Sequence, residues 1–353
     1  MKSLPRYSEI PAELYTSENA FQAEKEYALQ STWLLTAITH EFEEDGTYHS
    51  RELMGVPIII WRVGDEFKAY KNVCPHRHSK ILASDSSGVA GQLRCPYHGW
   101  EFNGAGRVCK IPDAQCFKGL KKEGSHNLSE IKLEVLGCLI FVRFDSSSKQ
   151  SLKEFMGDDY FTALGKLCTK AVQLLAARRS DLACNWKLIF ENSIEDYHTP
   201  TVHPNSFGQE IVLADADLRY ELNAIGNGCL MSGHNGGNGE GVNLDAPIVA
   251  LSLFNGFHAT LAKTPTTVVT FEQTLPTSAG TCERRLWVFC SKRATGARKD
   301  EIKHYSAQVQ SEDEVLMPGM QIGKQFADTA QLLGQYEARV SYFHEYLASL
   351  HQL

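Results

Sequence analysis

The periodicity of hydrophobic and polar positions along the chain changes near residue 35. Residues 21–33 contain no Gly or Pro and follow Ser17, Glu18 and Asn19, which are typical of a helix start, so we expect an N-terminal helix there. From that point, short β-rich runs separated by turn residues replace the helical pattern. We therefore predict an antiparallel β domain over residues 36–145, ended by a polar stretch.

Two of these β-rich runs predict a hairpin. They occupy residues 56–61 and 67–73 and are separated by the turn pair Gly64-Asp65. A further apolar run over residues 136–144 predicts a buried strand that completes the sheet.

The rest of the chain mixes strand and helix patterns. Residues 268–272 and 285–290 predict two strands of a second sheet. Later, four apolar residues and one acid recur at spacings of 3, 4, 4 and 3, which predicts a helix whose inward stripe includes the acid. That stripe consists of Ile302, Tyr305, Val309, Asp313 and Leu316.

Length and composition narrow the class of protein. With 353 residues, 43% of them hydrophobic and 22% charged, the chain resembles a globular enzyme and is long enough for two domains. The net charge of −7 comes without a basic tract, which argues against nucleic acid or an anionic membrane surface as the main partner. The first residues lack the apolar core of a signal peptide, and no stretch approaches the length of a membrane span. We therefore expect a cytoplasmic protein whose ten cysteines are reduced thiols, some of them bound to metal.

Two short segments offer the ligands of a metal cluster. Cys74 and His76 lie in the first segment, Cys95 and His98 in the second, with 18 residues between His76 and Cys95. Two thiolates and two imidazoles suit a Rieske [2Fe-2S] centre, in which the cysteines hold one iron and the histidines the other. Structural zinc also accepts two Cys and two His. Zinc fingers, however, group Cys with Cys and His with His, so we favour the iron-sulfur cluster.

A later segment offers two more imidazoles. If the segment is helical, Glu195 and His198 share one face and point into the same space. Pro200 would break that helix and let His203 turn back toward His198. Two histidines and one carboxylate form a facial triad, whose open coordination positions suit Fe(II) and O2. Without a cluster motif in the same chain, two unrelated histidines would be the commoner interpretation.

Asp313 is the candidate for the missing carboxylate. It lies on the inward stripe of the predicted helix, where an ionised carboxylate is costly unless it is paired or bound to metal. The alternative is an ordinary acid on the helix surface. The neighbouring Glu312 and Glu314 fall on other faces, and we expect them to be solvated.

These motifs resemble those of the Rieske non-haem iron oxygenases. Residues 72–77 and 95–100 resemble the family's cluster loops, and residues 195–203 and the surroundings of Asp313 resemble its mononuclear iron motif. The family usually has Gly in the first loop where this chain has His78, which we interpret as a loop residue and not a ligand.

The resemblance extends from the N-terminal helix to about residue 321 and implies an α+β fold. Residues 36–145 would form an antiparallel β Rieske [2Fe-2S] domain. Residues 1–35 and 150–353 would form the catalytic domain, a helix-wrapped antiparallel sheet that binds mononuclear Fe(II).

The resemblance also implies partners. No Gly-rich dinucleotide fingerprint is found, so a separate NAD(P)H-dependent reductase, a flavin or iron-sulfur protein, would supply electrons. In the family, the acid at the position of Glu195 is not a ligand but a bridge. It would link His198 of one subunit to His98 of its neighbour, which implies a homo-oligomer, by family analogy a ring-shaped homotrimer.

The substrate stays open at this stage. The acid at position 195 is Glu, as in the carnitine and glycine betaine oxygenases, whereas many ring dioxygenases have Asp. Three interpretations remain: dealkylation or hydroxylation of a quaternary or tertiary amine, hydroxylation or dihydroxylation of an aromatic ring, and demethylation of an aryl ether. A rival from a different class is a non-enzymatic Rieske electron carrier, which would hold two irons instead of three. Candidates for an aromatic substrate lining are Tyr220, Phe254, Phe257 and Trp287.

Overall fold

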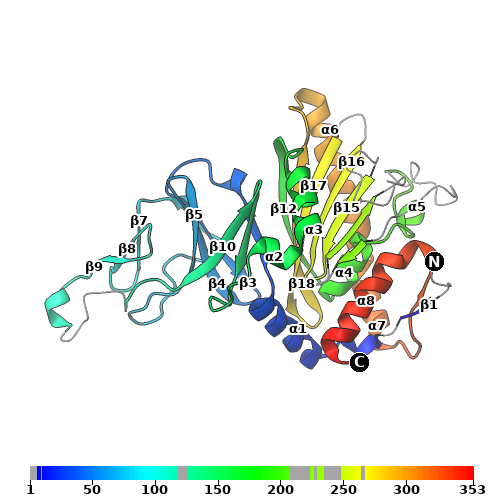
Figure 1. Cartoon of the computed structure of the whole chain (residues 1–353), viewed down its shortest axis with the longest axis horizontal. Helices are drawn as coiled ribbons and strands as arrows, with labels where there is room; N and C mark the ends of the chain where they lie inside the picture. Colours follow the sequence, from blue (N-terminus) through cyan, green and yellow to red (C-terminus); the bar gives the residue numbers. More distant parts are fainter. Residues whose placement is uncertain are drawn as a thin grey trace. The chain divides into compact units, whose positions relative to one another are not determined.

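The chain divides into two compact units, which are both visible in Figure 1. The computed structural model describes residues 6–8, 10–117, 126–206, 223–225, 229–233, 248–263 and 267–353. One unit is Leu29–Lys149, and the other combines Met1–Ala28 with Gln150–Leu353. Each unit is built on an antiparallel sheet, and helices accompany the sheet of the larger one, so the predicted α+β class is confirmed.

The smaller unit contains a seven-stranded sheet in the order β2-β11-β10-β5-β4-β3-β6 and a three-stranded sheet in the order β7-β8-β9. The larger sheet comprises β2 (Leu34–Ile38), β3 (Thr47–Leu53), β4 (Val56–Val63), β5 (Glu66–Lys71), β6 (Ser87–Val89), β10 (Glu130–Leu136) and β11 (Leu139–Arg143). The smaller sheet comprises β7 (Gln92–Arg94), β8 (Glu101–Asn103) and β9 (Val108–Lys110). Short 3-10 helices occur at Thr39–Glu41 and Ala114–Cys116.

The hairpin predicted in this unit is present as β4 and β5. Val63 pairs with Glu66 across a turn in which Gly64 has φ of 63°, a conformation that Gly adopts without strain. The apolar run over residues 136–144 was predicted to form one strand, and this prediction was wrong. Gly137 (φ 60°) makes a turn between β10 and β11. The strand begins only at Leu139, and all five residues of β11 are buried.

The larger unit contains the second seven-stranded sheet, in the order β12-β18-β17-β16-β15-β14-β13. The two predicted strands are the second and third from one edge and pair with each other, with Phe271 opposite Trp287. The sheet comprises β12 (Gln173–Leu182), β13 (Asn223–Ile225), β14 (Cys229–Gly233), β15 (Ile248–Leu253), β16 (Phe257–Lys263), β17 (Thr267–Ser278) and β18 (Thr281–Cys290).

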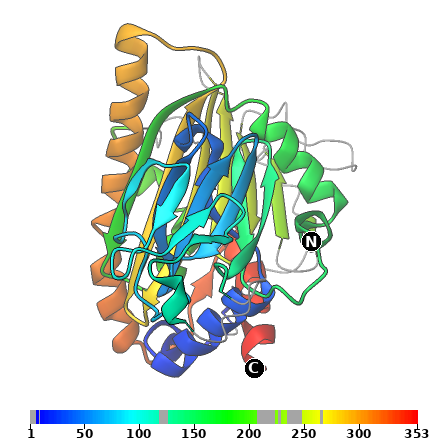
Figure 2. The same cartoon turned by 90° about the vertical axis from the view of Figure 1, so that its left-hand side faces the viewer.

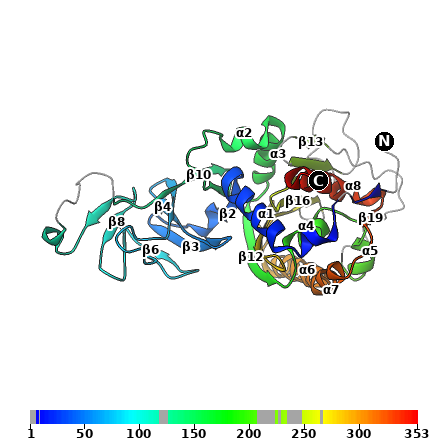
Figure 3. The same ribbon diagram turned by 90° about the horizontal axis from the view of Figure 1, so that it is seen from below.

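Helices cover this sheet. The predicted N-terminal helix is present as α1, which begins at Glu18. α4 packs on β17 and β18, and α6 runs lengthwise beside β12, as Figures 2 and 3 show. The helices are α1 (Glu18–Ser31), α2 (Leu152–Met156), α3 (Asp158–Cys168), α4 (Trp186–Ser193), α5 (Thr199–Val202), α6 (Gly296–Glu314), α7 (Met317–Gln325) and α8 (Ala338–His351). The other elements are the 3-10 turns Ala12–Tyr15 and Gln335–Glu337 and the strand pair β1 (Arg6–Tyr7) and β19 (Leu332–Leu333).

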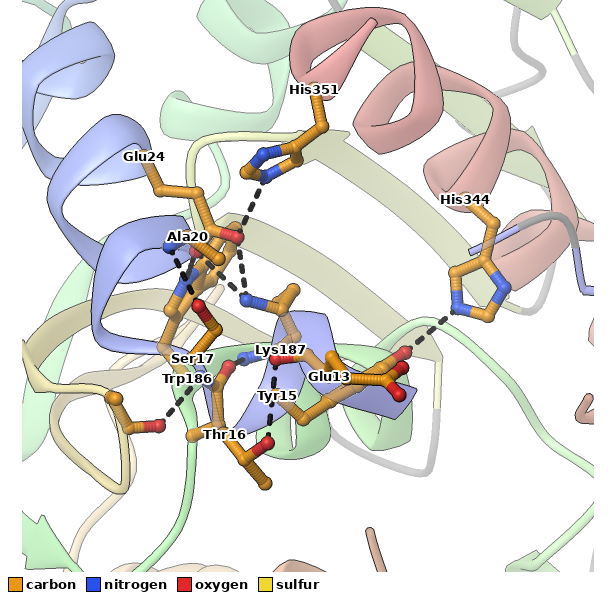
Figure 4. Close-up of polar contacts among 12 residues, drawn as sticks. Glu13, Tyr15, Thr16, Ser17, Ala20, Glu24, Trp186, Lys187, His344 and His351 are labelled. Atoms are coloured by element: carbon orange, nitrogen blue, oxygen red, sulfur yellow. Dashed lines mark hydrogen bonds and ion pairs between the residues drawn. The ribbon is translucent and has the colours of Figure 1, made fainter. Parts of the chain in front are cut away.

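A buried network of charged side chains joins α1, α4 and α8 (Figure 4). Lys187 of α4 is fully buried, and its Nζ lies 2.7 and 2.8 Å from the two carboxylate oxygens of Glu24 on α1. The indole N–H of Trp186 donates to the same carboxylate at 2.7 Å, and His351 Nε2 of α8 lies 3.1 Å from it. One turn further along α4, Glu191 accepts a hydrogen bond from the Tyr15 hydroxyl. These contacts fix α4, which leads to the residues of the candidate iron site.

Among the residues that the structure describes, no helix is both long enough and apolar enough to cross a membrane.

Candidate metal centres

The two cluster loops share one backbone design. In each loop the cysteine carbonyl accepts a hydrogen bond from the N–H four residues later, at 2.9 Å from His78 to Cys74 and at 3.0 Å from Gly99 to Cys95. The cysteine N–H in turn donates to the carbonyl five residues later, at 2.9 and 2.8 Å respectively. Both cysteines are buried free thiols. The sequence thus builds two similar turns that present equivalent ligands.

His78 occupies the position in the first loop that Gly99 occupies in the second. Their φ angles are 59° and 70°, both in the left-handed region. This conformation costs a residue with a side chain roughly 1–2 kcal/mol, which explains why Gly would suit the position. The imidazole of His78 is exposed. In this loop the backbone N–H of His78 contacts Cys74, whereas its side chain lies in solvent.

The four predicted cluster residues fit a Rieske centre. The ring centroids of His76 and His98 lie 4.5 Å apart, and the His76 ring stacks on Trp100 at 4.8 Å. His76 Nδ1 is buried without a hydrogen-bond partner, as expected of a nitrogen shaped to bind metal. Burial, and then the neighbouring thiol of Cys95, raise the pKa of the Cys74 thiol to about 11. Iron would reverse this effect, since a coordinating thiol is deprotonated.

The second site differs from the predicted continuous helix. α4 ends at Ser193, and His198 and His203 flank the separate short helix α5. The carboxylate of Glu195 accepts hydrogen bonds from the backbone N–H groups of Tyr197 and His198, which a continued helix would use internally. Pro200 therefore lies in the first turn of α5, where its missing N–H is tolerated, and does not terminate α4.

The two imidazoles and the predicted carboxylate converge. Asp313 is only 5% exposed, and its Oδ1 lies 3.0 Å from His203 Nε2 and 3.6 Å from His198 Nε2. One ligand atom from each of the three residues lies within 4.8 Å of the other two. Metal ligands at bond lengths of about 2.1 Å and right angles are separated by about 3 Å, so the three residues fit a metal ion.

Each histidine of this site has its own carboxylate. The Nδ1 of His198 contacts Glu195, and the Nδ1 of His203 lies 2.8 Å from Glu312. A proton held on each Nδ1 leaves each Nε2 free to bind metal. Burial by itself would lower the pKa of His203, but the neighbouring carboxylates of Asp313 and Glu312 outweigh burial and raise it.

Glu312 and Glu314 are only partly solvated, with 22% of each side chain exposed, and both have protein partners, so the prediction of solvated surface acids was wrong. Glu312 also contacts Ser206 and Gln308, and Glu314 lies 3.7 Å from Nη1 of the buried Arg284. The reason is that the buried face of α6 is rotated relative to the apolar stripe. Gln310 is buried along with Ile302 and Asp313, whereas Tyr305 and Leu316 are exposed.

A buried ion pair adjoins the site and was missed in the sequence. Arg284 of β18 donates from Nη2 to Glu272 of β17 at 2.8 Å, and Ser193 of α4 donates to the same carboxylate at 3.1 Å. Burial opposes the charge of Arg284, but Glu272 and then Asp313 and Glu314 outweigh burial and raise its pKa. The signals in the sequence are Glu272, the single charge of β17, and the charged run 283–285, which precedes the apolar part of β18.

The proposed aromatic lining finds no support in the described residues. Phe254 packs in the core, with ring centroids 5.4 Å from those of Phe343 and Tyr346. Phe257 and Trp287 are fully buried side chains of the second sheet. The other candidate, at position 220, lies outside the described residues.

Two family profiles match the chain in the order that the motifs predict. The Rieske [2Fe-2S] domain matches residues 32–126, and the catalytic domain of ring-hydroxylating alpha subunits matches residues 170–241. Since the second match is to a catalytic domain, the alternative of a simple electron carrier does not hold.

Known proteins with similar sequences are oxygenase subunits. The chain is 26% identical over 361 residues to the carnitine monooxygenase oxygenase subunit of Acinetobacter baumannii, covering 97% of this chain and 95% of the relative. It is 29% identical over 212 residues to the glycine betaine monooxygenase oxygenase subunit of Chromohalobacter salexigens, covering 59% of this chain and 46% of the relative. A solved quaternary ammonium Rieske monooxygenase has the same fold, with a TM-score of 0.84, 22% identity and coverage of 99% and 96% of the two chains. The chain therefore combines a Rieske [2Fe-2S] domain with a ring-hydroxylating catalytic domain, the type that binds mononuclear iron, and is homologous to oxygenase subunits of Rieske oxygenases.

Proposed function

We propose that this oxygenase hydroxylates a quaternary or tertiary amine at a carbon next to nitrogen. The observation that supports this substrate class is the similarity to a carnitine monooxygenase subunit over 97% of the chain, together with Glu at position 195. A multicomponent oxygenase needs a reductase. We infer that this reductase is a separate NAD(P)H-dependent flavin or iron-sulfur protein. The cytoplasmic location of the chain stays a prediction.

The cluster ligands are proposed from the paired loops. Cys74 and Cys95 would hold one iron, and His76 and His98 the other. The buried thiols, the unpartnered His76 Nδ1 and the two adjacent rings support this assignment.

The ligands of the mononuclear iron are proposed to be His198, His203 and Asp313. Their convergence within 4.8 Å carries this proposal. Iron held by two imidazoles and one carboxylate supplies O2 binding and oxygen insertion when substrate and electrons are present. The residues of the chain hold this triad in place: Glu195 and Glu312 each retain a proton on the Nδ1 of one histidine.

Glu195 is also proposed to connect subunits. Its carboxylate orients His198, and the next residue but one, Tyr197, is 60% exposed, so this segment reaches the surface of the chain. By resemblance to the family, the same carboxylate would contact His98 of a neighbouring subunit. That contact would carry electrons from the cluster of one chain to the iron of the next, in a homotrimer.

The proposed reaction balances with two electrons and two protons. One oxygen atom of O2 enters the C–H bond next to nitrogen, and the other leaves as water. The resulting carbinolamine then breaks its C–N bond and releases an aldehyde and a shorter amine.

The test is a turnover assay with a matched reductase. Carnitine, glycine betaine, proline betaine and choline are supplied one at a time, and aldehyde product is scored against NADH and O2 consumption. Asp313→Ala serves as a control: its cluster should still accept electrons from the reductase, but the variant should form no product.

The match to ring-hydroxylating subunits favours the alternative substrates. These are an aromatic ring that is hydroxylated or dihydroxylated, or an aryl ether that is demethylated. If no amine is turned over while a benzoate-like or phthalate-like acid gives a diol or phenol, that alternative replaces the amine.

A further inference from the structure

We propose that Glu312 is a positioning residue that fixes His203 for the mononuclear iron. This inference rests on the proposed function, because it requires His203 to be an iron ligand. Ser206 and Gln308 would assist by holding the carboxylate of Glu312.

The carboxylate of Glu312 is held at both oxygens. Oε2 lies 2.8 Å from His203 Nδ1 and accepts a hydrogen bond from the Ser206 hydroxyl at 2.9 Å. Oε1 accepts from the amide of Gln308 at 2.8 Å. A flexible side chain with both oxygens engaged loses its freedom to rotate, so the position of the acceptor facing His203 is defined.

The carboxylate of Glu312 determines the tautomer of the His203 ring. Because a carboxylate accepts and cannot donate, the proton of a neutral His203 lies on Nδ1 and the lone pair on Nε2. Nε2 lies 3.0 Å from Asp313 Oδ1, on the side where the ligand atoms converge. The tautomer and the direction of the ring therefore both suit metal binding.

One turn of α6 contributes to two of the three ligands. Asp313 is itself a proposed ligand, its neighbour Glu312 orients His203, and Gln308 lies four residues before Glu312 on the same helix. The rotation of α6 about its axis thus sets the directions of Asp313 and His203 together.

Glu312 differs from Glu195 in a way that makes it a clean probe. Glu195 accepts hydrogen bonds from backbone N–H groups as well as from His198, so its removal disturbs the local turn. Within the part of the chain that the structure describes, the carboxylate of Glu312 contacts side chains only. Its truncation should therefore change the imidazole it contacts and leave the backbone in place.

The experiment measures iron affinity, not activity alone. Holoprotein is titrated with an Fe(II) chelator, and the third iron is followed while visible absorbance reports the cluster. Loss of a carboxylate behind a histidine ligand weakens metal binding by roughly 10–100-fold, which we expect for Glu312→Ala. Glu312→Gln keeps an oxygen that can accept from Nδ1 and should lie between Ala and wild type. The matched control is Glu301→Gln, an exposed acid of the same helix, with wild-type affinity expected.

A second measurement separates positioning from a general structural role. The melting temperature of iron-free Glu312→Ala should match that of iron-free wild type, and only the increase caused by added Fe(II) should shrink. If the iron-free protein is destabilised as much as the iron-bound protein, or if iron affinity is unchanged, the inference is wrong.

If Glu312→Ala fails to fold, the variant Ser206→Ala tests the inference instead. Several-fold weaker iron binding supports the inference, and unchanged binding overturns it. His203→Ala distinguishes the two proposals, because retention of a third iron in that variant would contradict the proposed site itself.

Discussion

Replacement of Lys187 by Met should destabilise the catalytic unit strongly. The side chain is 0% exposed, and its ammonium lies 2.7 and 2.8 Å from the oxygens of Glu24, which is 3% exposed. Met has a similar volume, so the change removes the charge and leaves the core filled. Glu24 then remains as a buried carboxylate without its cation.

The expected magnitude follows from the remaining partners of that carboxylate. Breaking a buried ion pair by removing one partner costs about 3–5 kcal/mol. The indole of Trp186 and the imidazole of His351 still contact Glu24, so we expect the low end, about 3 kcal/mol. For a unit of this size, that loss lowers the melting temperature by roughly 6–12 °C.

The pH dependence gives a second readout. Burial would raise the pKa of Glu24, but Lys187 and then His351 outweigh burial and hold the pKa below its ordinary value. A carboxylate with a depressed pKa stabilises the fold above its unfolded pKa, and this contribution is lost as pH falls through the folded pKa. The difference between wild type and Lys187→Met should therefore be full at neutral pH and shrink in acid.

Thermal unfolding followed by circular dichroism tests this reasoning. The double variant Glu24→Gln with Lys187→Met removes both charges and should recover much of the lost stability. A single variant that melts within about 2 °C of wild type, or a double variant that is no more stable than the single one, would refute the claim that the ion pair fixes α4.

Three further predictions concern other residues. Glu195→Gln should retain three irons per chain, because the amide oxygen can still accept hydrogen bonds, yet turnover should fall by about 10–100-fold; iron analysis and product assays check this. Burial lowers the pKa of His258 to about 4, so wild type should lose roughly 3 kcal/mol of stability between pH 6.5 and pH 4, a slope that His258→Gln should lack in denaturant unfolding. His78→Gly should relieve the left-handed conformation and stabilise the cluster unit by about 0.5–1 kcal/mol, measured as a higher temperature of cluster bleaching.

Local patterns account for what the sequence predicted well. The β4–β5 hairpin follows from two β-rich runs around Gly64-Asp65, all within one stretch of chain. Asp313 was found because a carboxylate within an apolar stripe needs a partner, and the structure places it near two imidazoles. Both arguments need only a few neighbouring residues.

Interactions between distant residues account for what the sequence missed. Glu312 faces His203, which is 109 residues away, and the rotation of α6 that brings them together depends on how the helix packs. Lys187 and Glu24 are 163 residues apart and look like ordinary surface charges. α4 ends early because the side chain of Glu195 competes for backbone N–H groups, a choice that periodicity does not reveal.

The central claim is that this chain holds two separate iron centres through the residues named above. The most direct test is iron and acid-labile sulfide analysis of anaerobically reconstituted protein, with EPR spectra of the reduced state. Wild type should contain three irons and two sulfides per chain with the signal of mixed Cys and His ligation, and Asp313→Ala should keep that signal with only two irons. A wild type with two irons, or an Asp313→Ala variant that keeps three, would contradict the account.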